Sequence, residues 1–304
     1  MKKLKQKNKT IRSKQRNKST KFIHRFKQMI GGDISKFKEN YNNSQVTEEF
    51  TLIQKSTDIN NNDITKPTIV EIGRGGGGIV YVDNSQPKFV FKISKKGNVC
   101  RTWNNEKNIY DELSHYDLNS VNCKLIKMLS FENNGNSCFL ELSRVFNPIN
   151  KNANYTIHPQ FGKSTYNVFR QGRGLFLGIK ELFENNIFTP DNLEDYIKDL
   201  ALSMANLHYL AKNDGFDIEI FVGSTKNKNT LFIGDFDLSE MINEYNEYTI
   251  GRLVWSLYTV PYFPRKDELL GLFSENYIQQ AIKHGQSDVA KQVIAKYTED
   301  CSYD

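Results

Sequence analysis

The sequence contains no apolar run of about 18 residues, the length that a membrane-spanning helix requires. Its N-terminal residues are charged and polar, so we predict no secretory signal peptide there. Cysteine is also scarce, because the 304 residues include only four scattered cysteines and no C-x-x-C pair. We therefore expect reduced thiols in an intracellular protein of the cytoplasm or nucleus, with neither a disulfide framework nor a zinc site.

The net charge of +6 hides an uneven distribution of charged residues. Residues 1–27 contain twelve Lys or Arg and no acid, which leaves 29 of the 41 basic residues against 35 acidic ones elsewhere. Such a basic block cannot collapse into a core, so we predict a disordered tail over residues 1–30 and a polar linker over residues 31–66. The tail could bind nucleic acid, direct nuclear import or tether an acidic surface, and a solvated tail without a partner is the alternative.

A glycine-rich segment near residue 75 is followed by a strand-like run that contains a lysine. The segment matches the kinase pattern G-x-G-x-x-G-x-V through Gly73, Gly75, Gly78 and Val80. Glycine allows the backbone to close over phosphate oxygens, but a tight hairpin turn without a ligand has the same pattern. Lys92, in the apolar run 89–93, favours the nucleotide-binding interpretation, because the third strand of a kinase presents its phosphate-pairing lysine at this point.

Residues 67–142 show mainly the alternation of strands, with one helical stripe. We predict strands at 69–72, 79–82, 89–93, 123–129 and 137–142. A helix is expected from about residue 103 to 113, with Glu106 at the edge of its apolar stripe. A kinase helix carries a glutamate that pairs with the strand lysine, so Glu106 is the first candidate for that role and Glu112 the second. A solvated helix glutamate is the alternative.

Further along the chain, a buried helix leads into two acidic segments. Thr189 and Pro190 indicate the start of the helix, and apolar residues then recur at steps of three and four. One strand-like run follows Asp214, Asp217 and Glu219, and a second precedes Asp235 and Asp237. Two such strands joined by a polar loop form a hairpin that can bring carboxylates together around a metal–phosphate group. Solvated turn acids are the alternative.

These segments occur in the order of the protein-kinase superfamily, which the sequence resembles. Asp235-Phe236-Asp237 looks like the D-F-G element with Asp in place of Gly. Asp214 and Glu219 have the spacing of Asp and Asn in H-R-D-x-x-x-x-N, although Lys212-Asn213 replaces His-Arg. The resemblance implies an α+β, two-lobed protein-kinase-like fold, with a β-rich N-lobe at 67–142 and a mainly helical C-lobe at 143–304.

The resemblance also implies an atypical phosphotransferase that uses ATP and Mg²⁺. Lys92, held by Glu106, would orient the nucleotide phosphates. Asp235, with Glu219 or Asp237, would hold Mg²⁺. Either Asp214 or Asp217 would orient the hydroxyl of an acceptor, an unidentified protein or small molecule. The missing His-Arg points to the alternative of a pseudokinase that acts as a binding or scaffold module, and a nucleic-acid tether through residues 1–27 is a third interpretation.

The C-terminal half also resembles a fungal family of unknown function that is often labelled zinc-finger-like. Family members carry the segments D-x-x-D-x-E-F-V-x-G, L-D-F-D and D-P-Y-x-P-R-P. Here the corresponding segments are 214–223, 232–237 and 260–265, with Val260 in place of the first Asp of the last segment and Lys266 in place of its final Pro. The resemblance covers roughly residues 195–280 and implies no activity, and the scattered cysteines give the zinc label no support.

Overall fold

The computed structural model describes most of the chain after residue 68. The described residues are 69–74, 78–83, 87–94, 100–133, 138–151, 153, 155–162, 167–170, 174–225, 228–258 and 261–301. The expected tail, the expected linker and Gly75 lie outside them. The chain divides into two units, residues 1–70 with 82–87 and residues 71–81 with 88–304. Of the first unit the structure describes only residues 69–70, residues 82–83 and Pro87.

A five-stranded sheet forms from the first half of the described chain, in the order β1-β2-β3-β6-β5. Its strands are β1 (Ile69–Arg74), β2 (Gly78–Asp83), β3 (Phe89–Ser94), β5 (Met128–Asn133) and β6 (Cys138–Ser143). The pairs β3–β6 and β5–β6 are antiparallel, and Lys92 lies opposite Leu140. Apolar runs had predicted strands at 69–72, 79–82, 89–93 and 137–142, and the structure confirms them. The single strand predicted at 123–129 is wrong, because the chain there forms two strands that belong to different sheets, β4 (Cys123–Leu125) and β5.

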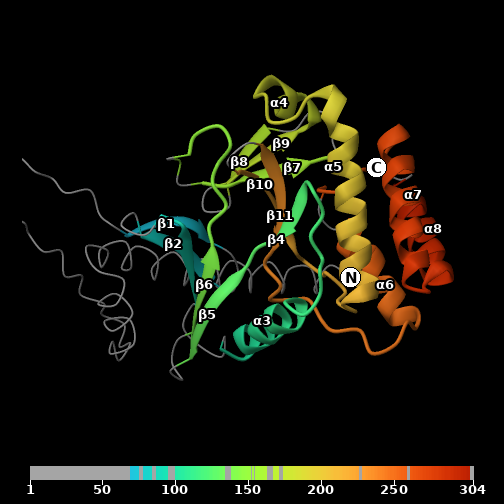
Figure 1. Ribbon diagram of the computed structural model, residues 1–304, viewed down its shortest axis with the longest axis horizontal. Helices are drawn as coiled ribbons and strands as arrows, with labels where there is room; N and C mark the ends of the chain where they lie inside the picture. The colour runs from blue at the N-terminus through green and yellow to red at the C-terminus, as the bar shows by residue number, and fades with distance from the viewer. Residues whose placement is uncertain are drawn as a thin grey trace, which may run out of the picture. The chain divides into compact units, whose positions relative to one another are not determined.

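Helix α3 (Cys100–Leu113) packs against β5 and β6 (Figure 1). Its apolar stripe is buried as the spacing predicts, with Trp103 and Ile109 at most 1% exposed. Glu106 lies on this same buried side and is 0% exposed, whereas the sequence placed it at the edge of the stripe. A carboxylate at that depth requires a charged or hydrogen-bonding partner.

A second sheet of six strands follows the order β4-β11-β10-β7-β9-β8. The strands are β4 (Cys123–Leu125), β7 (Ile157–Gln160), β8 (Asn167–Arg170), β9 (Gly174–Gly178), β10 (Glu219–Ser224) and β11 (Asn229–Gly234). The pairs β4–β11 and β7–β9 are parallel, and the other pairs are antiparallel. The hairpin β10–β11 was predicted. The sheet around it was not, and β4 joins it from within the segment that we assigned to the N-lobe.

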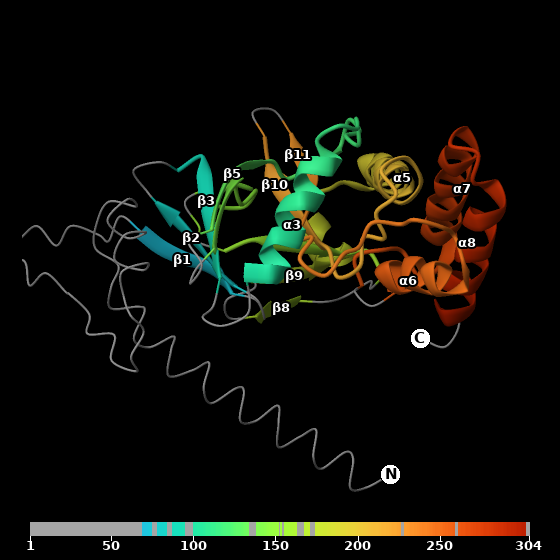
Figure 2. The same cartoon turned by 90° about the horizontal axis from the view of Figure 1, so that it is seen from below.

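Helices make up most of the chain after residue 178. They are α4 (Ile179–Glu184), α5 (Pro190–Ala205), the π-helical turn η1 (Asn206–Leu210), α6 (Glu247–Tyr258), α7 (Asp267–Lys283) and α8 (Ser287–Cys301). Helices α5, α7 and α8 lie side by side, and α6 packs against α8 (Figures 1 and 2). The predicted stripe of α5 is buried, and the N–H of Thr189 donates to Asn192 Oδ1 at 2.9 Å at the helix start. The α+β class is thus confirmed.

Two sequence expectations concern cysteines and membranes. Cys123 and Cys301 are buried free cysteines, and burial raises the pKa of the Cys123 thiol to about 12. Cys138 in β6 is disulfide-bonded, so the expectation of four reduced thiols is wrong for this residue. Among the described helices, none has the length and apolar character needed to span a bilayer.

Candidate functional site

The β10–β11 hairpin gathers acidic residues at one of its ends. Glu219, the first residue of β10, pairs with Gly234, the last residue of β11. Asp217 therefore enters the hairpin at the same end from which Asp235 leaves it. Both aspartates have a left-handed backbone conformation, with φ of 60° and 65°. Residues other than Gly, Asn and Asp rarely adopt this conformation. Strained residues of this kind concentrate at functional sites.

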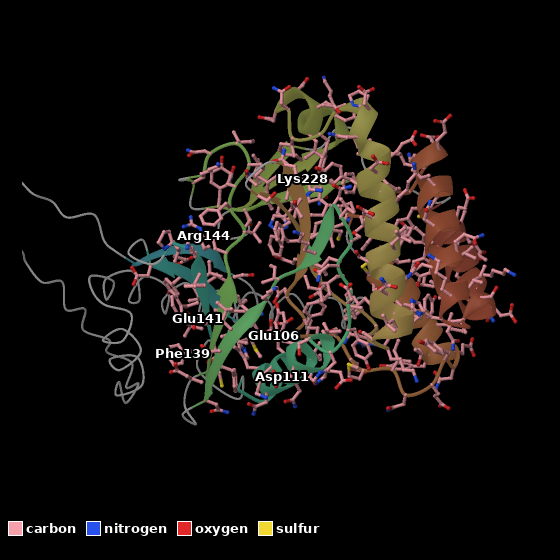
Figure 3. The ribbon with its side chains drawn as sticks, viewed as in Figure 1. Glu106, Asp111, Phe139, Glu141, Arg144 and Lys228 are labelled. Atoms are coloured by element: carbon pink, nitrogen blue, oxygen red, sulfur yellow. The ribbon has the colours of Figure 1, made fainter. Side chains whose placement is uncertain are left out.

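Lys92 on β3 lies between carboxylates from two other elements. Its Nζ donates to both carboxylate oxygens of Glu106, at 3.0 and 2.8 Å, and to Asp235 Oδ1. Lys92 is 7% exposed and Glu106 is fully buried. Figure 3 labels Glu106 on α3. The expected pairing of the strand lysine with a helix glutamate is therefore present, and Glu106 provides it. The second candidate, Glu112, instead accepts a hydrogen bond of 3.2 Å from the Tyr116 hydroxyl.

Negative charge exceeds positive charge around Lys92. Burial alone would lower the pKa of Lys92, but Asp235, Glu106 and Asp237 hold it well above its usual value. Burial raises the pKa of Glu106 to about 7 although Lys92 opposes the shift, and Asp235 adds to it. Burial and the charge of Asp235 likewise raise the pKa of Asp237 to about 6. One ammonium thus faces three carboxylates, and an added cation would be favoured there.

The raised pKa of Asp237 predicts how pH changes the free energy of unfolding without added metal. From about pH 4 upward to its folded pKa of about 6, this carboxyl binds more protons in the folded state than in the unfolded chain. Its contribution to stability therefore falls as pH rises through that window. His208 acts oppositely, because burial lowers its pKa to about 3 and its protonation favours the unfolded chain. A measurement of stability against pH must therefore separate the contribution of Asp237 from that of His208.

We expect the variant Asp237→Asn to melt above the wild type by roughly 2–4 °C near pH 7.5, the shift that about 1 kcal/mol produces. The difference should shrink toward about pH 4.5, where the wild-type carboxyl is protonated. Thermal denaturation of both proteins in EDTA across this range measures it, and His208 cancels in the comparison. Asp195→Asn on α5, whose side chain is 67% exposed, is the matched control. A difference between wild type and Asp237→Asn that does not change with pH would contradict the expectation.

The two candidates for orienting an acceptor hydroxyl have different environments. Asp214 is 2% exposed, and its Oδ1 accepts the backbone N–H groups of Phe216 at 3.0 Å and Glu240 at 2.9 Å. Its other oxygen pairs with Arg252 on α6. Asp217 is exposed, and its charge helps to raise the pKa of Asp237. Of the two, Asp217 is thus the exposed aspartate, whereas Asp214 holds three parts of the chain together.

The glycine-rich segment is only partly described. Gly73 and Val80 are half-buried in β1 and β2, and Gly75 lies outside the described residues. At Gly78 a Cβ would lie 2.6 Å from Cζ2 of Trp103, so the packing of that indole requires the absence of a side chain. The Trp103 ring also lies beneath Lys92, with Nζ 5.1 Å from its centroid. Gly78 therefore helps to set the depth of the Lys92 side chain.

Three residues to which no separate role was assigned from the sequence also shape the site. Phe236 is fully buried, and its ring meets the edge of Tyr110 on α3 at 5.3 Å, which ties the residue between Asp235 and Asp237 to the helix of Glu106. Arg252 lies 38 residues after Asp214, and Trp103 was assigned only to the apolar stripe. The only local sequence signal for a role of Trp103 was its position three residues before Glu106, on the same side of the helix.

No group of three or more His, Cys, Asp or Glu residues is arranged to hold a metal ion within the described part of the chain. Mg²⁺ does not need such a cage, since one or two carboxylates together with substrate phosphates commonly hold it. Asp235 and Asp237 fit this type of site. No protein-family model matches the chain, and none of the curated proteins matches it. The kinase-like and fungal resemblances therefore stay predictions.

Proposed function

We propose that this protein binds ATP with Mg²⁺ and transfers the γ-phosphoryl group to an acceptor hydroxyl, on a two-lobed protein-kinase-like fold. The observation that carries the proposal is Lys92 on a strand, buried between Glu106 of a helix and Asp235 after a hairpin. A buried ion pair of this kind rarely adds stability over apolar packing. Its uncompensated negative charge fits a metal–phosphate group that would bind beside it.

Each charged residue has a role in the proposed reaction. Lys92, oriented by Glu106, would pair with the nucleotide phosphates, and Asp235 with Asp237 or Glu219 would hold Mg²⁺, which neutralises phosphate charge. Asp217 would accept the hydroxyl proton while the acceptor oxygen bonds to the γ-phosphorus. The bond from that phosphorus to the bridging oxygen then breaks, and ADP leaves with the electron pair. Catalysis of this type depends mainly on positioning and charge stabilisation.

A pseudokinase that serves as a binding module is the second candidate. Asp214, which has the H-R-D spacing to Glu219, is fully engaged by Arg252 and two backbone N–H groups. An aspartate so engaged cannot also orient an acceptor. The choice between enzyme and scaffold therefore depends on Asp217. A role for residues 1–27 in binding nucleic acid falls outside the described residues and stays a prediction, as does an intracellular location.

Nucleotide binding is the first test of the proposal. ATP with Mg²⁺ should stabilise the folded protein by about 2.7 kcal/mol at a hundredfold excess over its dissociation constant. The shift on adding nucleotide should fall sharply in Lys92→Met and lose its Mg²⁺ dependence in Asp235→Asn, since these changes remove the phosphate and metal contacts. Thermal denaturation with ATP, with and without Mg²⁺, measures both.

Lys107→Met on the same helix as Glu106 is a matched control, because the Lys107 side chain is 37% exposed and pairs with Asp111 on the same helix. Its shift should equal that of the wild type. Trp103 gives an independent readout, since its ring lies beneath Lys92. A Trp255→Phe background removes the only other tryptophan, so any change in emission then reports on the site. An unchanged melting temperature at millimolar ATP with Mg²⁺ would contradict the proposal.

A further inference from the structure

One face of α6 leaves large aromatic side chains exposed. Tyr248 is 65% exposed and Trp255 is 59% exposed, although the opposite face of the helix buries Leu253 and Leu257 completely. The two aromatic residues are seven positions apart, so they lie on one side of the helix about 10 Å from each other along its axis. Exposed aromatics in this arrangement are a common feature of docking surfaces.

This face continues onto the loop that follows Asp237. Arg252, between the two aromatic residues, donates to the carbonyl oxygen of Leu238 at 3.0 Å. Leu238 is 47% exposed, and Met241, three residues further, is 38% exposed. Four of the eight large apolar side chains that are exposed among the described residues thus gather here. We refer to Leu238, Met241, Tyr248 and Trp255 as the α6 surface.

The chain that carries this surface is strongly acidic. Residues 235–251 contain no Lys, Arg or His, and their acidic residues are Asp235, Asp237, Glu240, Glu244 and Glu247. The adjoining cation, Arg252, is already paired with buried Asp214 and lies 3.7 Å from Glu240. The Glu240 side chain is 58% exposed, and Glu244 and Glu247 are exposed as well. A partner with positive charge is therefore favoured, and a nucleic acid is repelled.

The α6 surface adjoins the site itself. Leu238 directly follows Asp237, and the guanidinium of Arg252 on α6 lies 4.6 Å from the ring centroid of Phe216, the residue before Asp217. A ligand anchored on Tyr248 or Trp255 can therefore place another part of itself near Asp217. The separation of these two anchors along α6 exceeds what a small acceptor needs but suits an extended polypeptide, which advances about 3.3 Å per residue.

We propose that the α6 surface binds the phosphoryl acceptor, a polypeptide segment that carries Lys or Arg residues and large apolar side chains. This inference rests on the proposed function where it calls the polypeptide a phosphoryl acceptor. Binding of the polypeptide to the α6 surface does not need nucleotide. The apolar side chains cover Trp255 and Tyr248, the basic side chains meet Glu240, Glu244 and Glu247, and a hydroxyl-bearing residue reaches Asp217.

A binding measurement without nucleotide tests the inference. The probe is a fluorescein-labelled synthetic peptide of Lys, Arg and Leu with one Ser, followed by fluorescence anisotropy with the full-length protein. Its affinity should fall roughly tenfold in Trp255→Ala, the loss expected of an aromatic anchor, and it should also fall in Glu244→Lys and at high salt. Ile282→Ala on α7, where the side chain is 45% exposed, is the matched control and should bind as the wild type does.

Several outcomes would overturn the inference. Equal binding of a peptide with Glu in place of Lys and Arg would remove the charge argument. Equal affinities of Trp255→Ala and Ile282→Ala for the basic peptide would show that Trp255 is not an anchor for it. Displacement of the peptide by equimolar spermine would identify a small cation as the ligand, and concentration-dependent sedimentation that Trp255→Ala abolishes would identify a second copy of the chain. Peptide binding without any nucleotide shift would instead contradict the proposed function and leave the surface as a docking site.

Discussion

Asp217→Asn is expected to reduce the rate of phosphoryl transfer by about 10²-fold or more while the affinity for ATP changes little. The variant keeps the size of the side chain but can no longer accept the proton of an acceptor hydroxyl. Asn tolerates the left-handed backbone that this position requires, φ 60°, so the fold should be retained. Steady-state measurements of kcat and KM with the basic peptide described above give the effect.

Asp195→Asn is the control for this experiment, since its carboxylate lies on the surface of α5 and is 67% exposed. It should match the wild type in both kcat and KM. Wild-type protein that binds ATP and Mg²⁺ but transfers no phosphate to peptides or small hydroxyl compounds would favour the pseudokinase. In that case Asp217→Asn would change neither rate nor nucleotide affinity.

The local part of the fold could be predicted from the sequence. Alternating apolar residues specified β1, β2 and β3, and the spacing of three and four residues specified α3 and α5. These patterns are local, because each reflects one buried face of one element. The pairing of Lys92 with Glu106, which the structure shows, was predicted from the kinase resemblance, with Glu112 as the second candidate.

The six-stranded sheet could not be predicted in the same way. Strands β7 and β8 have four residues each, too few to show a period, and β4 was predicted only as part of a longer strand at 123–129. The parallel pairing of β4 with β11 joins residues about a hundred positions apart, such as Cys123 and Leu231. Pairing over that distance is decided by packing in the folded state, and no local pattern records it.

The choice between Asp214 and Asp217 shows the same limit within the site. Spacing favoured Asp214, because it stands five residues before Glu219. The structure buries Asp214 against Arg252, which comes from α6 and has no sequence signal that relates it to the acidic segment. Motif spacing therefore pointed to the acidic segments but could not assign a role to each carboxylate.

Arg252→Ala is expected to destabilise the protein by about 3–5 kcal/mol, the cost of leaving a buried carboxylate without its cation. The change also removes the hydrogen bond to the Leu238 carbonyl oxygen, 3.0 Å, and the stacking of the guanidinium on Phe216 at 4.6 Å. Chemical denaturation of the wild type and the variant measures the loss of free energy.

The double-mutant cycle with Asp214→Asn then separates a structural Asp214 from a catalytic one. If Asp214 only anchors the loop, Arg252→Ala should cost much less in the Asp214→Asn background, because no buried charge remains to be compensated. Folded Asp214→Asn should then retain kcat within a few-fold of the wild type. A stable Asp214→Asn protein with turnover reduced as far as in Asp217→Asn would instead assign the acceptor-orienting role to Asp214. The ion pair with Arg252 would then describe a closed state of the site that must open before transfer.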